Sequence, residues 1–125
     1  MTFVYHQGLI RVAVEIVYEG TRFEIENCIV DTGSATTAFD IDLVPFNYRK
    51  SAIIRRLCGV GGGTQEVVSQ VIDMFSLDGC TLHSVAIEFG NISSPFGING
   101  FIGNDILQQF VIQLDFPRRK FSLIS

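Results

Sequence analysis

The sequence Ile29-Val30-Asp31-Thr32-Gly33-Ser34 places a carboxylate directly after a short apolar run. The apolar residues predict the end of a buried strand, and the glycine allows the backbone to turn sharply and to approach a neighbouring group closely. A carboxylate presented in this way can act as a general base, and two that share one proton can activate a water molecule. The motif occurs once in the chain. A paired arrangement therefore requires a second copy.

The composition predicts one ordered domain over residues 1–125. Hydrophobic residues make up 47% of the 125 residues and charged residues 18%, a balance typical of a chain with a packed core. The net charge of -4 and the pI near 5.0 disfavour binding to nucleic acid or to an anionic membrane surface. No segment approaches the ~18 consecutive apolar residues of a membrane span.

Cysteine usage and the first residues disfavour a secreted protein. The chain has three cysteines, Cys28, Cys58 and Cys80, an odd number at wide spacings that match no small disulfide framework. The segment Met1 to His6 has no basic region followed by an apolar run and a small-residue cleavage site. We therefore expect a cytoplasmic protein.

Period-two alternation of apolar residues predicts a mostly-β fold. Residues 10–18 alternate, Glu19-Gly20 predicts a turn, and Phe23, Ile25 and Ile29 continue the period on the returning strand. Further strands are predicted at 71–77, 82–89, 111–115 and 120–124. Further turns are predicted at Asp78-Gly79 and at the glycine-rich residues 59–63. Helical signal is thin: it predicts a short helix over Asn104–Phe110, with Asn104 or Asp105 as the N-cap, and the segment from Pro45 to Arg56 is ambiguous.

Other kinds of site have little support. Residues 59–63 lack the spacing and the lysine of a phosphate-binding loop. His6 and His83 are isolated and no Cys-x-x-Cys pair is present, which disfavours a metal site. The remaining carboxylates also have structural roles that suffice. We expect Asp40 and Asp42 to cap or solvate a turn, Asp105 to cap the short helix, and Asp115 to lie at an exposed edge.

Two strings at a defined separation resemble the retropepsin-like aspartic proteases. The first is Ile29 to Ser34, and the second is Phe101-Ile102-Gly103, about 70 residues later and followed by the predicted helix. A hairpin precedes the first string, and a glycine-rich turn lies between the two. The resemblance spans about residues 9–123. It implies an all-β, single-domain closed barrel with a flap hairpin and one short C-terminal helix.

The resemblance also implies roles for individual residues. Asp31 would be the catalytic carboxylate, Thr32 would bridge to its counterpart in a second subunit, and Gly33 would bond substrate backbone. Ser34 stands where retroviral members usually carry alanine, and we expect its hydroxyl to donate to Asp31 and favour the ionised carboxylate. Phe101, Ile102 and Gly103 would support the Asp31 loop from beneath. The substrate-binding flap would comprise Cys58, Gly59, Val60, Gly61, Gly62 and Gly63.

The implied function is that of an aspartic endopeptidase that acts as a homodimer on a peptide or protein substrate. One Asp31 from each subunit would activate a shared water, without a metal or another cofactor. Phe121 to Ser125 is the candidate strand for a dimer sheet. An alternative is a non-catalytic peptide-binding or dimerisation module that retains the fold, because a fold does not fix a function.

Overall fold

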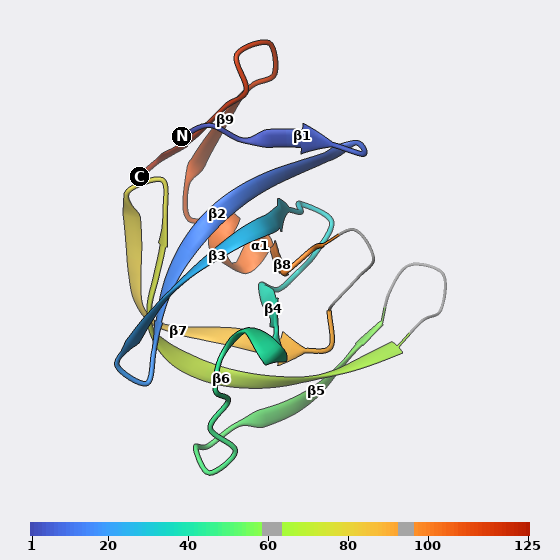
Figure 1. Cartoon of the computed structure of the whole chain (residues 1–125), viewed down its shortest axis with the longest axis vertical. Coiled ribbons are helices and arrows are strands. Elements are labelled where there is room, and N and C mark those ends of the chain that lie inside the picture. Colours follow the sequence, from blue (N-terminus) through green and yellow to red (C-terminus); the bar gives the residue numbers. More distant parts are fainter. Residues whose placement is uncertain (59–63, 93–96) are drawn as a thin grey trace.

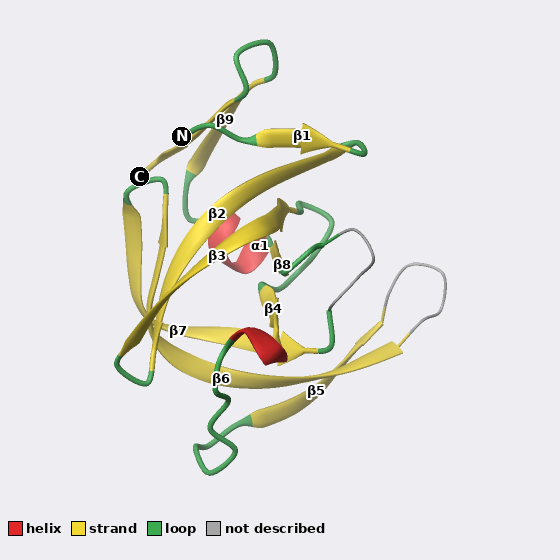
Figure 2. Cartoon of the chain, viewed as in Figure 1, coloured by secondary structure: helices red, strands yellow, loops and turns green. Residues whose placement is uncertain are grey.

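A computed structural model of the chain describes residues 1–58, 64–92 and 97–125. Strands dominate these residues, as Figure 2 shows, with one short α-helix and one short 3-10 helix, η1. The elements are β1 (Val4–His6), β2 (Leu9–Tyr18), β3 (Thr21–Val30), β4 (Ala38–Asp40), η1 (Ile41–Leu43), β5 (Ile53–Cys58), β6 (Thr64–Leu77), β7 (Cys80–Gly90), β8 (Gly100–Ile102), α1 (Asn104–Leu107), β9 (Val111–Asp115) and β10 (Lys120–Ile124).

The main sheet closes on itself. Its strands are ordered β1-β2-β3-β8-β4-β7-β6-β5, and residues 15–17 of β2 also pair with residues 74–76 of β6. This extra antiparallel pairing closes β2, β3, β8, β4, β7 and β6 into a barrel. β1 and β5 are attached outside this ring (Figure 1). The predicted all-β closed barrel with one short helix near the C-terminus is confirmed.

The alternation in the sequence explains β2 from Val12 onward, whereas Arg11 before it is buried against the pattern, and it explains β3 only in part. Val12, Val14 and Ile16 are buried along β2, as the period predicts. On β3 the period breaks at Asn27, which has a φ of 54°, and the pairing register with β2 shifts there. Such a bulge adds one residue to a strand. The neighbouring residues Cys28 and Ile29 are consequently both buried, so the alternation of buried and exposed residues shifts by one position just before Asp31.

Two-residue turns join the long hairpins. The predicted turns at Glu19-Gly20 and Asp78-Gly79 are confirmed, and all four residues have positive φ values between 49° and 77°. Positive φ at both central positions fits the right-handed twist of the flanking strands, and glycine adopts it without steric cost. A third turn of the same kind, which we did not predict, is Gln7-Gly8 between β1 and β2.

Aromatic rings fill the barrel interior. Phe39 on β4, Phe75 on β6 and Phe89 on β7 are almost completely buried. The ring centroid of Phe39 lies 6.4 Å from that of Phe75 and 6.5 Å from that of Phe89. Tyr18 on β2 joins them, with its centroid 5.7 Å from that of Phe89. Buried aromatic pairs contribute packing energy beyond their apolar area, so this cluster holds the opposite walls of the barrel together.

The C-terminal hairpin differs from the expectation for a dimer strand. β10 pairs with β9 on one side. On its other side the Phe121 amide donates to the Met1 carbonyl, and the Leu123 amide donates to the Asp78 carboxylate. Phe121 to Ser125 was therefore the wrong candidate, because intrachain bonds already occupy the outer edge of β10. Within the described residues, the opposite edge of the hairpin, that of β9, pairs with no other strand.

No helix of the described chain is long and apolar enough to cross a lipid bilayer.

Asp78 connects the two ends of the chain to the β6–β7 turn. Its carboxylate accepts from the Met1 ammonium at 3.0 Å and from the Leu123 amide at 3.0 Å. Burial alone would raise the pKa of the Asp78 carboxyl, but the Leu123 amide and the Met1 ammonium outweigh it and hold this pKa below its ordinary value. The ionised form therefore stabilises the folded state.

We predict that Asp78→Asn lowers the free energy of unfolding at pH 7 by about 1–2 kcal/mol, because charge-assisted bonds are lost. A lowered folded-state pKa contributes stability that is present above the unfolded value, about 3.9, and is lost as pH falls through the folded value. The difference between wild type and variant should shrink below about pH 4. Denaturant unfolding at pH 7 and pH 3 measures it, with exposed Asp42→Asn as the control. An equal difference at both pH values would contradict this role.

Candidate active site

Two parallel strands deliver Asp31 to the surface. β8 runs alongside the end of β3, with Ile29 opposite Phe101 and Val30 opposite Ile102. The pairing extends one step further, because the Asp31 amide donates to the Ile102 carbonyl at 2.9 Å. Ile102 is completely buried and Phe101 is half-buried. The backbone at Asp31 is thus fixed by the sheet, while its side chain is half-buried at the strand end.

The turn after Asp31 holds the carboxylate by a backbone bond. The Gly33 amide donates to Asp31 Oδ1 at 2.9 Å, and the Ser34 amide donates to the Asp31 carbonyl at 3.2 Å. A Cβ atom at Gly33 would lie 3.2 Å from Asp31 Oδ1, so a larger residue there would require a small shift of the carboxylate. Thr32 and Gly33 are exposed. The motif therefore presents one oriented carboxylate on an accessible turn.

The expectation for Ser34 was wrong. Its hydroxyl donates to the Thr36 carbonyl at 2.8 Å rather than to the Asp31 carboxylate. The side chain follows the local loop, where a carbonyl two residues further on accepts its bond, a pattern common for serine. Ser34 consequently shapes the loop after Asp31, and the Gly33 amide takes the place that we expected for the hydroxyl.

Gly103 is the point of closest approach between the two strings. A Cβ atom there would lie 2.3 Å from the Thr36 carbonyl oxygen and 2.8 Å from that of Ser34. Real Cβ atoms do not approach backbone oxygens so closely, so only glycine fits. The loop that carries the candidate catalytic residues rests directly on Gly103, as the resemblance implied for the Phe101-Ile102-Gly103 string.

The same loop caps the N-terminus of α1. The Asn104 amide donates to the Ser34 carbonyl at 2.8 Å, and the Asp105 amide donates to the Ala35 carbonyl at 3.2 Å. These amides lack partners within any helix and need an outside acceptor. The predicted helix to Phe110 was too long, because α1 ends at Leu107, and its N-cap is Gly103 rather than Asn104 or Asp105. Backbone carbonyls of the loop therefore bond the first two amides of α1.

The Asp105 side chain anchors the loop, and it also accepts from the Ile106 amide in the first turn of α1 at 2.8 Å, so the expected bond to the helix start is present. Its carboxylate accepts from the Thr37 amide at 3.0 Å and from the Thr37 hydroxyl at 2.7 Å. The hydroxyl in turn accepts from the Gly103 amide at 3.0 Å. Thr37 is completely buried. We assigned Thr37 no role from sequence, because its importance depends on a contact with a residue 68 positions away.

Asn104 adds a bond to the exposed part of the turn. Its side-chain amide donates to the Thr32 carbonyl at 2.7 Å. Asp40, in contrast, behaves as expected, because it is the N-cap of η1 and accepts from the Asp42 amide at 3.4 Å. The Glu88 amide of β7 donates to the Thr37 carbonyl at 3.1 Å. With this bond, each backbone carbonyl from Thr32 to Thr37 except that of Gly33 accepts a hydrogen bond from α1, from β7 or from the loop itself.

Most of the expected flap lies outside the described part of the chain. Gly59, Val60, Gly61, Gly62 and Gly63 lie outside the described residues, and Cys58 is the last described residue of β5. The strands on either side pair in register from Ile53–Ser69 to Cys58–Thr64, so the hairpin that would carry them is present. Within the described ranges, no three His, Cys, Asp or Glu side chains come together as a metal site would require.

Comparison with known proteins places this geometry in a family. The model of the retroviral aspartyl protease family matches residues 5–115, which include Asp31, the paired strands and Gly103. The chain belongs to the retroviral aspartyl protease family. The structure is also similar to the crystal structure of a retropepsin-like aspartic protease from Rickettsia conorii, with a TM-score of 0.58 and 12% identity. That match covers 92% of this chain and 84% of the other. No curated protein sequence matches the chain.

The loop after Asp31 has its carbonyls bonded by α1, by β7 and within the loop, so its backbone is held in one arrangement. An aspartic protease needs a carboxylate whose position is fixed before substrate binds, because stabilisation of developing charge depends on preorganised groups. In this chain the fixing groups are backbone atoms and the Thr37–Asp105 pair. The similarity to the Rickettsia conorii protein concerns the fold.

We predict that Gly103→Ala lowers the free energy of unfolding by about 1–3 kcal/mol, the usual cost of overfilling a packed site. The cause is the clash of the added methyl group with the Thr36 carbonyl. Denaturant unfolding measures the change, and Gln108→Ala at the exposed end of α1 is the control. A stability equal to that of wild type would show that the loop does not rest on Gly103.

Proposed function

We propose that the protein hydrolyses peptide bonds as a homodimeric aspartic endopeptidase. The observation that carries this proposal is the half-buried Asp31 carboxylate, held by the Gly33 amide at the end of a paired strand. Family membership supports it. Because the motif occurs once, the second carboxylate is Asp31 of another copy.

The chemistry follows from two such carboxylates facing one another. At a separation of about 3 Å they do not both ionise readily, so they share one proton. The ionised member takes a proton from a water placed between them, and the water oxygen attacks the carbonyl carbon of the peptide. The protonated member donates to the carbonyl oxygen, and the nitrogen leaves with a proton as the C–N bond breaks.

An extended peptide fits the described surroundings of this site. Thr32 and Gly33 expose polar backbone at the turn, and β5 and β6 form a hairpin that reaches beyond the barrel (Figure 1). A peptide that lies between turn and hairpin would bond through its backbone on both sides, with alternate side chains in pockets. We propose this mode for the substrate.

We predict that Asp31→Asn abolishes peptide cleavage, with a loss of at least about a hundredfold, because the variant cannot take the proton from water. Its thermal unfolding and its sedimentation should equal those of wild type, since the bond from the Gly33 amide to the side-chain oxygen is retained. Cleavage of a random-peptide library from pH 4 to 7 measures the activity. Cleavage by the variant at the wild-type rate would refute the assignment.

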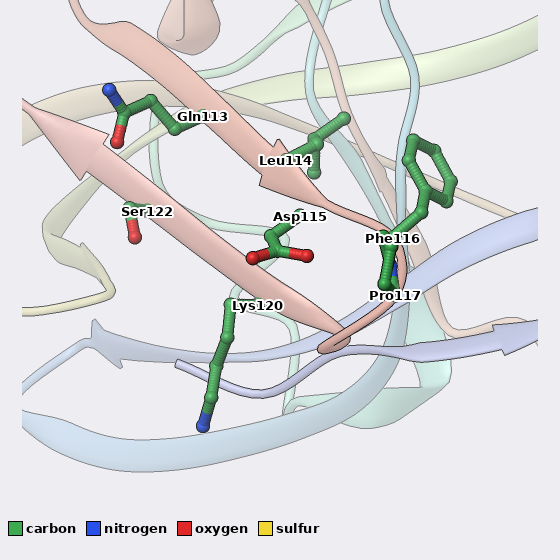
Figure 3. Close-up of a pocket in the computed structure, with 7 residues that line it drawn as sticks. All are labelled: Gln113, Leu114, Asp115, Phe116, Pro117, Lys120 and Ser122. Carbon is green, nitrogen blue, oxygen red and sulfur yellow. The ribbon is translucent and has the colours of Figure 1, made fainter.

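For the dimer, we propose that the outer edge of β9 pairs with that of a second copy. Val111 and Phe116 on or beside this strand are exposed by 61% and 41%. A groove of about 650 Å³ lies on the same hairpin and has Leu114 and Phe116 among its lining residues. Figure 3 shows these two side chains. Exposed apolar side chains beside an open strand edge favour pairing with another strand.

The register of the strands supports this choice of edge. Val4 on β1 is opposite Arg11, which is opposite Ile29 near the end of β3. The Tyr5 ring, next along β1, lies 5.5 Å from the Phe116 ring in the turn that follows β9. The hairpin and the Asp31 turn therefore lie at the same end of the barrel. Two copies joined through β9 would bring their Asp31 turns toward one another.

We predict that Val111→Arg converts the dimer into a monomer and removes cleavage, because an exposed charge at a sheet edge opposes pairing. Sedimentation at micromolar protein concentration measures the assembly state. The control is Val71→Arg, because Val71 is an exposed valine on β6, away from the hairpin. A Val111→Arg protein that stays dimeric would exclude this edge as the interface without affecting the Asp31 prediction.

A further inference from the structure

One buried carboxylate lies outside the candidate catalytic pair and beside its loop. The Glu88 side chain on β7 is only 4% exposed. The strand places it next to the loop after Asp31, since Glu88 is opposite Ala38 of β4 on one side and opposite Ser69 of β6 on the other. A buried carboxylate is costly unless it is paired and hydrogen-bonded. Its partners therefore indicate why it stands there.

The partners of Glu88 come from two separate parts of the chain. Its Oε2 accepts from the Thr36 hydroxyl at 3.2 Å, and its Oε1 lies 3.4 Å from Arg55 Nη1. The Glu88 amide also donates to the Thr37 carbonyl at 3.1 Å. Thr36 and Thr37 belong to the loop after Asp31, whereas Arg55 belongs to β5. A single side chain thus connects the loop and the hairpin.

The connection spans an open space rather than a packed interface. Ile53 of β5 is opposite Ser69, which is opposite Glu88, so Arg55 reaches diagonally across β6 to the carboxylate. A cavity of about 320 Å³ is bounded by Thr36, Arg55, Ser69 and Glu88 together with side chains of α1. Backbone pairing with β6 holds β5 in the sheet, and the ion pair adds a side-chain contact from Arg55 of β5 across the cavity to Glu88 beside the loop.

We propose that Glu88 is a positioning residue that, through Arg55, holds β5 at the separation from the Asp31 loop that an extended peptide requires. This inference rests on the proposed peptidase function. Asp31 itself is fixed by the Ile102 carbonyl and the Gly33 amide, neither of which involves Glu88. The contact therefore governs how tightly the peptide is held, and the bond-breaking step proceeds at its normal rate once the peptide is bound.

The test compares KM and kcat for one peptide across single variants. Glu88→Gln keeps an acceptor for the Thr36 hydroxyl but removes the charge that attracts Arg55, and Arg55→Met removes the guanidinium. For a charge-assisted contact that is partly exposed to water, each is expected to raise KM by about three- to tenfold and to leave kcat within about twofold. Arg55→Lys should restore most of the lost affinity, because it keeps the positive charge.

A double variant and a remote control separate this role from general destabilisation. The Glu88→Gln/Arg55→Met protein should have a KM no higher than that of either single variant, because both disrupt the same contact. The control, Arg22→Met, breaks an ion pair of 2.6 Å with Glu15 between β2 and β3, and should leave KM unchanged. Wild-type KM values in both single variants, or an equal rise in the control, would overturn the proposal.

Failure of the inference and failure of the proposed function give different results. If wild type cleaves peptides and Asp31→Asn does not, the kinetic comparison decides the role of Glu88 alone. If wild type cleaves nothing, hydrogen exchange of amides 53–56 in the unliganded protein decides whether the tether exists. The Glu88→Gln and Arg55→Met proteins should then exchange these amides at least about threefold faster than wild type. Unchanged exchange would overturn the inference.

Discussion

The contact between Gly103 and the backbone of residues 34–36 is the constraint on which the site depends. It brings together two sequence strings that lie about 70 residues apart. They are so close that a Cβ atom at Gly103 would overlap the Thr36 carbonyl oxygen. Three consequences follow from this closeness. The loop carbonyls cap α1, the Gly103 amide reaches the Thr37 hydroxyl, and that hydroxyl reaches Asp105. A larger residue at 103 would separate the helix from the loop and weaken all of these bonds together.

The arrangement holds Asp31 mainly with backbone atoms. Its amide is bonded to β8 and its carboxylate to the turn, while Thr37 and Asp105 secure the loop from the buried side. Backbone donors are fixed by the sheet and lose little entropy when they bond. In the proposed role of Glu88, its side chain connects this loop to Arg55 of β5. The Asp31 carboxylate is thus oriented by groups of its own chain, whereas the proposed reaction needs two such carboxylates, one from each of two chains.

The predictable parts of the structure are those whose signals are local. Alternation indicated β2, and the pairs Glu19-Gly20 and Asp78-Gly79 indicated their turns, because each depends on neighbouring residues. The bulge at Asn27, the bond from the Ser34 hydroxyl to Thr36 and the role of Thr37 were missed. Each depends on packing against distant strands or on a choice between nearby acceptors, which local pattern does not encode. The free edge of β9 likewise became visible only when the partners of β10 were known.

The most direct test of the shared site is a mixing experiment with wild-type and Asp31→Asn subunits. The two proteins are combined at constant total concentration, allowed to exchange subunits, and assayed for cleavage of one peptide. If both Asp31 carboxylates of a dimer are required, activity falls with the square of the wild-type fraction. A linear fall would show that one chain suffices and would contradict the account.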